Sequence, residues 1–205
     1  MASTIVGDAQ KQKDVSVCFF FCKYGEPAKS TFHSMARTFL LQLLRQNQDL
    51  LPYIYDSQVQ SCEVTLSGGT TLEALLCEGL KNSGNTKIII DGLDECEKPE
   101  RTKILAWLKS TIGGAHLPDG TSPMKAMVVS TDELDIKKAL SKFLRKEIQP
   151  TDMDSALQSY LALRILELQQ KFSLSDAESA GIVQIVLQRA KGKLMCSRFL
   201  QCILT

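Results

Sequence analysis

The sequence predicts an α/β protein with a parallel β-sheet and flanking helices, followed by a small all-helical part. Three apolar runs, at residues 15–21, 87–91 and 124–130, predict strands; the first has the β-branched and aromatic composition of a strand buried on both faces, and the second is also predicted to be buried. Amphipathic helical patterns separate these runs. Strands that alternate with helices are typical of crossover connections between parallel neighbours. We expect the strand at residues 87–91 to lie between the other two.

Helical periodicity accounts for most of the sequence between these strands. Residues 2–12 have the pattern of the end of a helix, and apolar residues recur at helical spacing through residues 32–44. We expect a polar connecting segment at residues 52–69 and a short fourth strand at residues 145–149.

The character of the sequence changes at about residue 150. Beyond it the apolar spacing is helical only, and Ser175 and Glu178 have the Ser-x-x-Glu spacing of a capping box. A further helix is predicted at residues 194–204. The domains that we expect are therefore an α/β core at residues 1–149 and a helical subdomain at residues 150–205.

Composition and charge restrict the class of protein. The chain has 205 residues, of which 44% are hydrophobic, so it can form a substantial core. The formal net charge is +1, which gives no overall field to attract nucleic acid or an anionic membrane. The 7 cysteines fall mainly in predicted strands and helices, which favours reduced thiols. There is no membrane span or signal peptide pattern, and we expect a cytoplasmic protein.

The sequence FFCKYGEPAKSTF raises the question of a phosphate-binding loop. A P-loop reads G-x-x-x-x-G-K-[ST], and its glycines let backbone N–H groups surround the phosphates. When Lys29 and Ser30 are aligned with the last pair, Lys23 and Ala28 stand at the glycine positions. Without glycine the loop cannot readily adopt the positive-φ turns of a cradle. The alternative is a strand-to-helix turn in which Ser30 or Thr31 is the N-cap, and we favour it.

The most informative segment is IIIDGLDE, which begins at Ile88. Its apolar residues predict a buried strand, and open α/β sheets bind ligands at the carboxyl ends of their strands. Asp91 stands there, where it can hold Mg²⁺ directly or through water. Asp94 and Glu95 follow within reach of a water that attacks a γ-phosphate. This pattern is typical of a Walker B element. The alternative is an acidic loop in which Asp94 or Glu95 caps a helix.

The segment KIIIDGLDECE resembles the Walker B segment of NACHT-type P-loop NTPases of the signal-transduction (STAND) class. It is most similar to a fungal, repeat-containing group with a nephrocystin-like N-terminal NACHT region. The segments DVSVCFFFCKYGEP, VVSTDELDIKKAL and QIVLQRAKGKLMCSRFLQCIL resemble parts of that region in the same order. The resemblance implies that intact relatives bind Mg-ATP or Mg-GTP, hydrolyse it and oligomerise. It also implies a metal-binding role for Asp91 and catalytic roles for Asp94 and Glu95.

Two departures from the family pattern lead us to expect weak or absent nucleotide binding. In the family, the Walker A loop precedes the helix that residues 2–12 resemble, so we expect an N-terminally truncated chain without the first strand and the P-loop. Many relatives end the strand at residues 124–130 in Ser-Ser-Arg, where the Arg senses the γ-phosphate. This chain has Asp132 at the sensor position, and an anion there repels phosphate. The alternative for Asp132 is a cap on the helix that begins near Leu134.

The expected function is that of a NACHT-like nucleotide-binding signalling module that retains Walker B, lacks the P-loop and is inactive in hydrolysis. The rival interpretation is a non-enzymatic interaction fragment that has the same fold and needs no cofactor. An incomplete sheet would leave the strand at residues 124–130 as an open edge. A second copy or a partner protein could pair with that edge.

Overall fold

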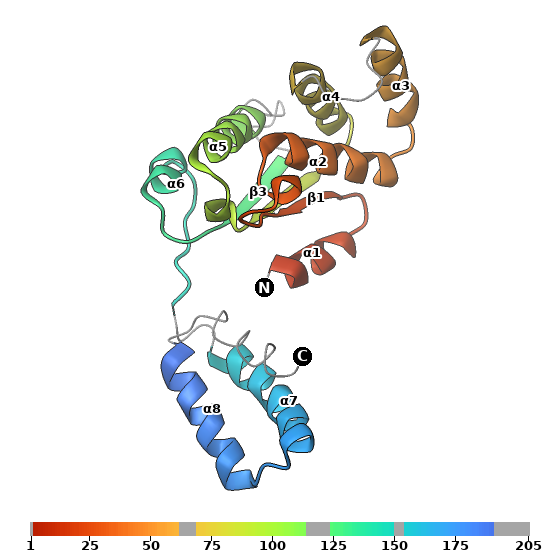
Figure 1. Cartoon of the computed structure of the whole chain (residues 1–205). Coiled ribbons are helices and arrows are strands. Elements are labelled where there is room, and N and C mark those ends of the chain that lie inside the picture. Colours follow the sequence, from red (N-terminus) through yellow and green to blue (C-terminus); the bar gives the residue numbers. More distant parts are fainter. Residues whose placement is uncertain (1, 62–68, 114–123, 150–153, 191–205) are drawn as a thin grey trace. The chain divides into compact units, whose positions relative to one another are not determined.

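The computed structural model describes residues 2–61, 69–113, 124–149 and 154–190, and these form parts of two compact units, residues 1–142 and 143–205 (Figure 1). The first unit contains α1 (Ala2–Gln10), β1 (Ser16–Phe21), the 3₁₀ turn η1 (Pro27–Lys29), α2 (Phe32–Gln46), α3 (Leu50–Ser61), α4 (Gly69–Lys81), β2 (Thr86–Asp91), the 3₁₀ turn η2 (Leu93–Glu95), α5 (Lys98–Gly113), β3 (Met124–Val129) and α6 (Leu134–Ala139). The second contains α7 (Asp154–Phe172) and α8 (Asp176–Ala190).

The three strands form one parallel sheet in the order β1-β2-β3. Asp91, the last residue of β2, lies between Phe21 of β1 and Val129 of β3 in the register. The predicted α/β class, the parallel pairing and the central position of β2 are confirmed. Because the strands run in one direction, their carboxyl ends meet at one edge of the sheet.

The two faces of the sheet are covered unequally (Figure 1). On one face α2 packs against β1 and α5 against β3, and α4 packs on α2. The other face is covered by α1, through Val6 and Ala9. The prediction of a buried strand is correct for β2, and burial on both faces is correct for Val17 and Cys18 of β1 but wrong at the end of β1, because a single short helix cannot cover three strands. Phe21 of β1 is 37% exposed, and most of β3 is only half-buried.

Two other sequence predictions are wrong. The expected polar segment at residues 52–69 begins as helix α3, because Leu50 and Ile54, one helical turn apart, are both buried in the main core. Residues 145–149 are not a strand; their side chains are exposed, so no burial stabilises an extended pairing there. The helix predicted at residues 194–204 lies outside the described residues.

Two predicted helix caps are confirmed. Thr31 is the N-cap of α2, where its Oγ1 accepts a hydrogen bond from the Ser34 N–H at 3.2 Å. At the start of α8, the Ser175 N–H donates to Glu178 Oε2 at 2.9 Å and the Glu178 N–H donates to Ser175 Oγ at 3.4 Å. This reciprocal pair is a capping box. It ends the turn between α7 and α8, which pack together around the buried Leu161 and Leu168.

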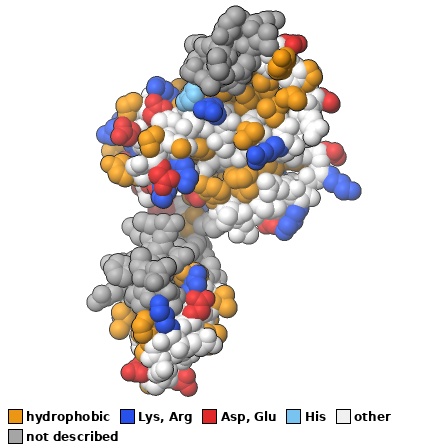
Figure 2. Space-filling view, turned by 45° about the vertical axis from the view of Figure 1, so that its right-hand side comes forward, with side chains coloured by type: hydrophobic (Ala, Val, Ile, Leu, Met, Phe, Trp, Pro, Cys, Tyr) orange, Lys and Arg blue, Asp and Glu red, His pale blue; other side chains and the backbone are white. Residues whose placement is uncertain are grey.

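The visible surface has no dominant charge. On the face that Figure 2 shows, Lys and Arg side chains are interspersed with Asp and Glu rather than gathered by sign. Within the described ranges, no helix has both the length and the apolar character that a membrane span requires.

Two glutamines of α2 complete the hydrogen bonding at the outer edge of β1. Gln46 Oε1 accepts from the Val17 N–H at 2.7 Å, and its Nε2 donates to the Val17 carbonyl at 2.9 Å. Gln42 forms the same pair with Phe19, at 2.8 and 3.0 Å. The spacing matches because Gln42 and Gln46 are one helical turn apart and Val17 and Phe19 are on the same side of the strand. The two amides therefore satisfy the edge in place of a further strand.

We expect Gln46→Met to lower the free energy of unfolding by about 1–2 kcal/mol, because it leaves the N–H and the carbonyl of the buried Val17 without a partner. Methionine keeps the length of the side chain and removes both hydrogen bonds. Urea unfolding followed by circular dichroism measures the difference.

The matched control is Gln48→Met, at an exposed residue for which no side-chain hydrogen bond is found in the described part of the chain. The control should leave the unfolding midpoint unchanged. Equal stability of the two variants would contradict the edge-capping role of Gln46.

Candidate functional site

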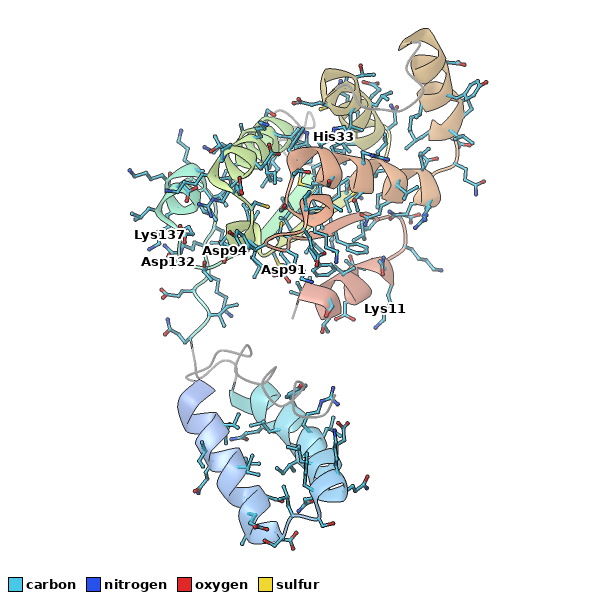
Figure 3. The ribbon with its side chains drawn as sticks, in the orientation of Figure 1. Lys11, His33, Asp91, Asp94, Asp132 and Lys137 are labelled. Carbon is cyan, nitrogen blue, oxygen red and sulfur yellow. The ribbon has the colours of Figure 1, made fainter. Side chains whose placement is uncertain are left out.

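The predicted acidic residues lie at the carboxyl edge of the sheet, at the exit of its central strand. Asp91 ends β2, and Gly92, with φ +73°, turns the chain into η2, which carries Asp94 and Glu95. A Cβ at residue 92 would lie 3.3 Å from Glu95 Oε1 and 3.4 Å from the Cys22 carbonyl oxygen. The positive φ therefore favours glycine here, and a Cβ would also require the Glu95 side chain to shift by a few tenths of an ångström. Figure 3 shows Asp91 and Asp94 at this end of the sheet.

Asp94 and Glu95 fasten the segments that leave the two neighbouring strands. Asp94 Oδ1 accepts from the Thr131 N–H at 3.0 Å, and its Oδ2 accepts from Thr131 Oγ1 at 2.8 Å. Glu95 Oε2 accepts from the Tyr24 N–H at 3.0 Å. The acidic turn is thus bound to the exit of β3 on one side and to the exit of β1 on the other. The catalytic roles of Asp94 and Glu95 stay a prediction.

Asp91 has a different environment. Its side chain is half-buried, and burial, followed by repulsion from Glu95 and Asp94, raises the pKa of its carboxyl above the ordinary value. Within the described ranges, no group of three or more His, Cys, Asp or Glu side chains comes together as a metal site. Mg²⁺ is commonly held by one or two carboxylates, with waters and phosphate oxygens as the other ligands. Asp91 fits the role of such a single protein ligand.

The loop after β1 is a strand-to-helix turn closed by its own contacts. The Lys23 N–H donates to the Lys29 carbonyl at 2.9 Å, and the Lys29 ammonium forms an ion pair with Glu26 at 2.9 Å. The Phe32 N–H, at the start of α2, donates to Glu100 Oε2 at 2.8 Å. At this turn, two backbone donors that a phosphate could use, the Tyr24 and Phe32 N–H groups, are therefore bonded to carboxylates of the protein itself.

The predicted sensor position, Asp132, lies after β3. It is exposed and forms an ion pair with Lys137 of α6 (Figure 3). The N-cap position of α6 is Glu133, so the alternative that Asp132 caps this helix is wrong. The negative charge of Asp132 is therefore partly compensated by a lysine of the next helix. Its effect on a phosphate stays a prediction.

Arg101 is a residue of this edge that the sequence did not single out. It is only 4% exposed, and its Nε donates to Asp135 of α6 at 2.8 Å, with Glu133 at 3.8 Å. Its Nη1 donates to the Asp94 carbonyl oxygen at 3.3 Å. A buried cation thus connects α5, α6 and the acidic turn. An arginine in an amphipathic helix is normally exposed, so sequence spacing gave no signal for this role.

A second contact missed by sequence reasoning joins Cys22, directly after β1, to Cys96, directly after η2. Both residues are buried, and their thiols form a side-chain hydrogen bond. This bond and burial raise the pKa of Cys22, whereas the same bond and the nearby charge of Arg101 lower the pKa of Cys96. A signal existed, because both cysteines follow strands that were predicted to be neighbours.

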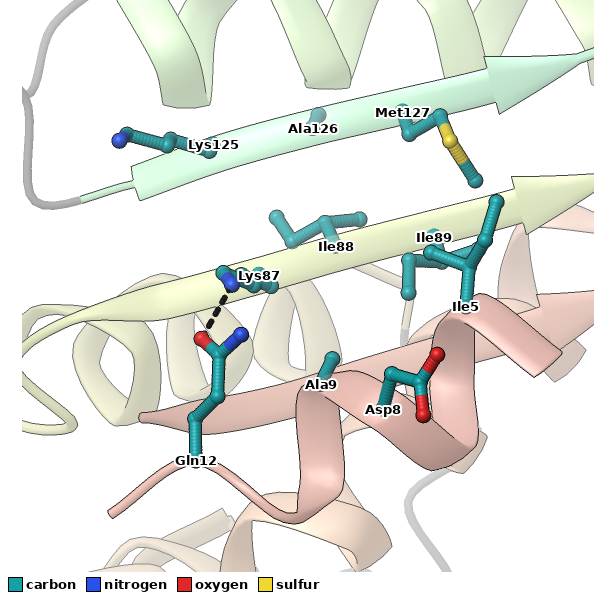
Figure 4. Close-up of a pocket in the computed structure, with 10 residues that line it drawn as sticks. All are labelled: Ile5, Asp8, Ala9, Gln12, Lys87, Ile88, Ile89, Lys125, Ala126 and Met127. Carbon is teal, nitrogen blue, oxygen red and sulfur yellow. Dashed lines mark hydrogen bonds between the residues drawn. The ribbon is translucent and has the colours of Figure 1, made fainter. Parts of the chain in front are cut away.

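Two cavities in the first unit lie away from this edge. One, of about 300 Å³, is a groove between α1 and the sheet, lined by residues that include Ile5, Lys87, Lys125 and Met127 (Figure 4). Lys87 and Lys125 are near the amino ends of β2 and β3. The other, of about 540 Å³, lies among α2, α3 and α4. Neither cavity is lined by the predicted site residues.

These features define an α/β protein whose central parallel strand ends in an acidic turn bound to both neighbours. The family model described as Nephrocystin 3, N-terminal matches residues 1–131, a range that includes all three strands and the acidic turn. The chain therefore belongs to the nephrocystin-3 N-terminal family. The nephrocystin-like part of the resemblance is confirmed. No curated protein and no solved structure gave a significant match.

The raised pKa of Asp91 makes a prediction about pH. At pH values well below 3.8, the ordinary pKa of this carboxyl, Asp91 is protonated in both the folded and the unfolded state. At pH values above its raised pKa in the folded state it is charged in both states, and burial disfavours the charge only in the folded state. The folded state binds more protons between these values, so the contribution of Asp91 to stability decreases as pH rises. We expect Asp91→Asn to raise the melting temperature at about pH 7 and to lose this advantage at about pH 3.5.

Thermal unfolding across this pH range measures the effect. The control is Asp49→Asn, at an exposed residue, which should leave the melting temperature at pH 7 close to that of the unsubstituted chain. A lower melting temperature for Asp91→Asn at neutral pH would show instead that the Asp91 carboxylate stabilises the folded state.

Proposed function

We propose that the chain is a NACHT-like nucleotide-binding signalling module of the cytoplasm that retains the metal-binding half of its site. The observation that carries this proposal is the position of Asp91, half-buried at the carboxyl end of the central parallel strand. That is the edge at which open α/β sheets bind ligands. Membership of the nephrocystin-3 N-terminal family is consistent with it.

In this proposal, Asp91 is the protein ligand of Mg²⁺. The ion would supply the positive charge that neutralises nucleotide phosphates beside an acidic turn. Asp94 is a positioning residue, because its carboxylate is bonded to both the N–H and the hydroxyl of Thr131. Glu95 has one oxygen bonded to the Tyr24 N–H, so any action on a water would fall to its other oxygen.

The phosphate-binding half of the site is weak in this proposal. The 205 residues contain no Gly-Lys-Ser or Gly-Lys-Thr sequence. At the turn after β1, the Tyr24 and Phe32 N–H groups are bonded to Glu95 and Glu100. Carboxylates at this turn would repel an incoming phosphate, although Glu100 is also paired with Lys103 at 2.7 Å. We therefore infer that Mg-ATP or Mg-GTP binds weakly or not at all, and that the chain does not hydrolyse it.

The second candidate function is that of a non-enzymatic interaction fragment that binds no nucleotide. The observation that favours it is the asymmetry of the sheet edges. Gln42 and Gln46 satisfy the edge at β1, whereas β3 pairs only with β2 among the described residues. In this alternative, a second copy or a partner protein adds a strand beside β3.

Isothermal titration calorimetry of the full chain tests the two candidates. We expect Mg-ATP to bind with a Kd no tighter than about 1 mM, and we expect no phosphate release above background. Asp91→Asn should abolish the weak binding, because it removes the proposed metal ligand. The matched control is Asp49→Asn, at an exposed residue of the turn after α2.

Each outcome favours one candidate. Weak binding that requires both Mg²⁺ and Asp91 supports the nucleotide-binding module. Absence of binding up to about 10 mM Mg-ATP supports the interaction fragment. Hydrolysis at several turnovers per minute that is lost in Asp91→Asn would contradict both candidate functions. The segment that contains Lys29 would then have to be reconsidered as a phosphate-binding loop.

A further inference from the structure

Two buried cysteines meet beneath the carboxyl edge of the sheet. Cys22 is the first residue after β1, and Cys96 is the first residue after η2. The residues are 7% and 4% exposed, and their thiols form a hydrogen bond with each other. The contact joins segments that are 74 positions apart in the sequence (96 − 22 = 74).

The backbone on both sides holds these segments together. The Cys22 N–H donates to the Asp91 carbonyl at 2.8 Å, which continues the pairing of β1 with β2 by one residue. The Cys96 N–H donates to the Leu93 carbonyl at 3.2 Å, which closes η2. Two residues beyond Cys22, the Tyr24 N–H is bonded to Glu95, the neighbour of Cys96. These hydrogen bonds hold the segments that carry the two cysteines beside each other.

We propose that Cys22 and Cys96 are a redox-sensitive pair that a peroxide converts to a reversible disulfide. One thiol of the pair, as its thiolate, attacks an oxygen of hydrogen peroxide. The O–O bond breaks, the sulfur becomes a sulfenic acid, and the departing hydroxide takes up a proton to give water. The second thiol attacks the sulfenic sulfur, the S–S bond forms, and a second water leaves. The sum is two thiols and one peroxide to one disulfide and two waters.

The pair of cysteines is flanked by exposed residues. The residues next to it along the chain are exposed, including Lys23, Tyr24 at 75% and Glu97. A thiol–disulfide exchange with a dithiol such as dithiothreitol reverses the oxidation and leaves the oxidised dithiol as product. The disulfide would join the exit of β1 covalently to the acidic turn. It would do so where the Glu95 bond to the Tyr24 N–H already joins them.

The other described cysteines have different surroundings. The thiol of Cys18 is directed to the Phe39 carbonyl oxygen, at 4.0 Å, and burial raises its pKa to about 12. Cys77 is in α4, away from the strand exits. Among the cysteines that the structure describes, selective oxidation of the pair Cys22 and Cys96 is therefore the expected result.

The decisive experiment is disulfide mapping of the folded full chain. The protein is treated with one equivalent of hydrogen peroxide, free thiols are blocked with N-ethylmaleimide, and the digest is analysed by mass spectrometry without reduction. The expected product is a cross-linked peptide pair that contains Cys22 and Cys96, lost after dithiothreitol. A disulfide between any other two cysteines, or sulfinic acids at Cys22 or Cys96 without a cross-link, would overturn the proposal.

Stability gives a second readout. A disulfide that closes a loop of this length should raise the melting temperature by about 5–10 °C, because it restricts the unfolded chain. The shift should be absent in Cys22→Ala and Cys96→Ala and retained in Cys18→Ala, the matched control at a buried cysteine of the same strand. A peroxide-induced shift that persists in Cys96→Ala would also overturn the proposal. If an alanine variant does not fold, the mapping of the unsubstituted chain decides.

Discussion

The structure of the first unit depends on the central strand β2, which is hydrogen-bonded along both sides and is the best buried of the three strands. Ile88 and Ile90 face the core formed with α2 and α5, and Ile89 faces α1. A strand of this kind has no freedom to shift its register, because a slip of one residue would exchange the residues on its two faces. The carboxyl end of β2 is therefore held in one position, and the acidic turn follows it directly. The segments that follow β1 and β3 are hydrogen-bonded to that turn.

Two carboxylates of the turn have a structural role, whether or not a ligand binds. Asp94 and Glu95 hold the exits of β3 and β1, and the carbonyl of Asp94 also receives the buried Arg101. Burial and the acidic neighbours Glu95 and Asp94 raise the pKa of Asp91, and no hydrogen bond of its carboxylate to a neighbouring strand exit is found in the described part of the chain. Substitution of Asp94 would thus disturb loop positions as well as any chemistry, so loss of activity in such a variant cannot by itself identify a catalytic residue. Substitution of Asp91 separates an effect on ligand binding from an effect on loop position more clearly.

The α/β class, the strand order and the caps at Thr31 and Ser175 could be predicted because they depend on local composition and on rules for parallel sheets. The extent of burial could not be predicted for β1 and β3, since apolar residues mark a strand without stating how many helices cover it. Helix α3 was missed because its polar residues hide the spacing of two buried side chains. The role of Arg101 depends on acids from α6 that only the tertiary structure brings near. At the site, the sequence predicted which acidic residues lie at the carboxyl edge of the sheet, but not the groups to which they are hydrogen-bonded.

The hydrogen bonds of the β1 exit determine what a nucleotide would have to overcome. A phosphate needs backbone N–H groups and a cation, and here the Tyr24 and Phe32 N–H groups are bonded to carboxylates while Lys29 is paired with Glu26. An incoming anion would have to displace two anions that are part of the chain and therefore already present at high effective concentration. It would also leave the displaced carboxylates close to its own charge. An Mg²⁺ ion held by Asp91, as proposed, would offset only part of this repulsion, because Asp91 ends β2 and lies outside the turn after β1. The internal carboxylates therefore make the closed turn the favoured state.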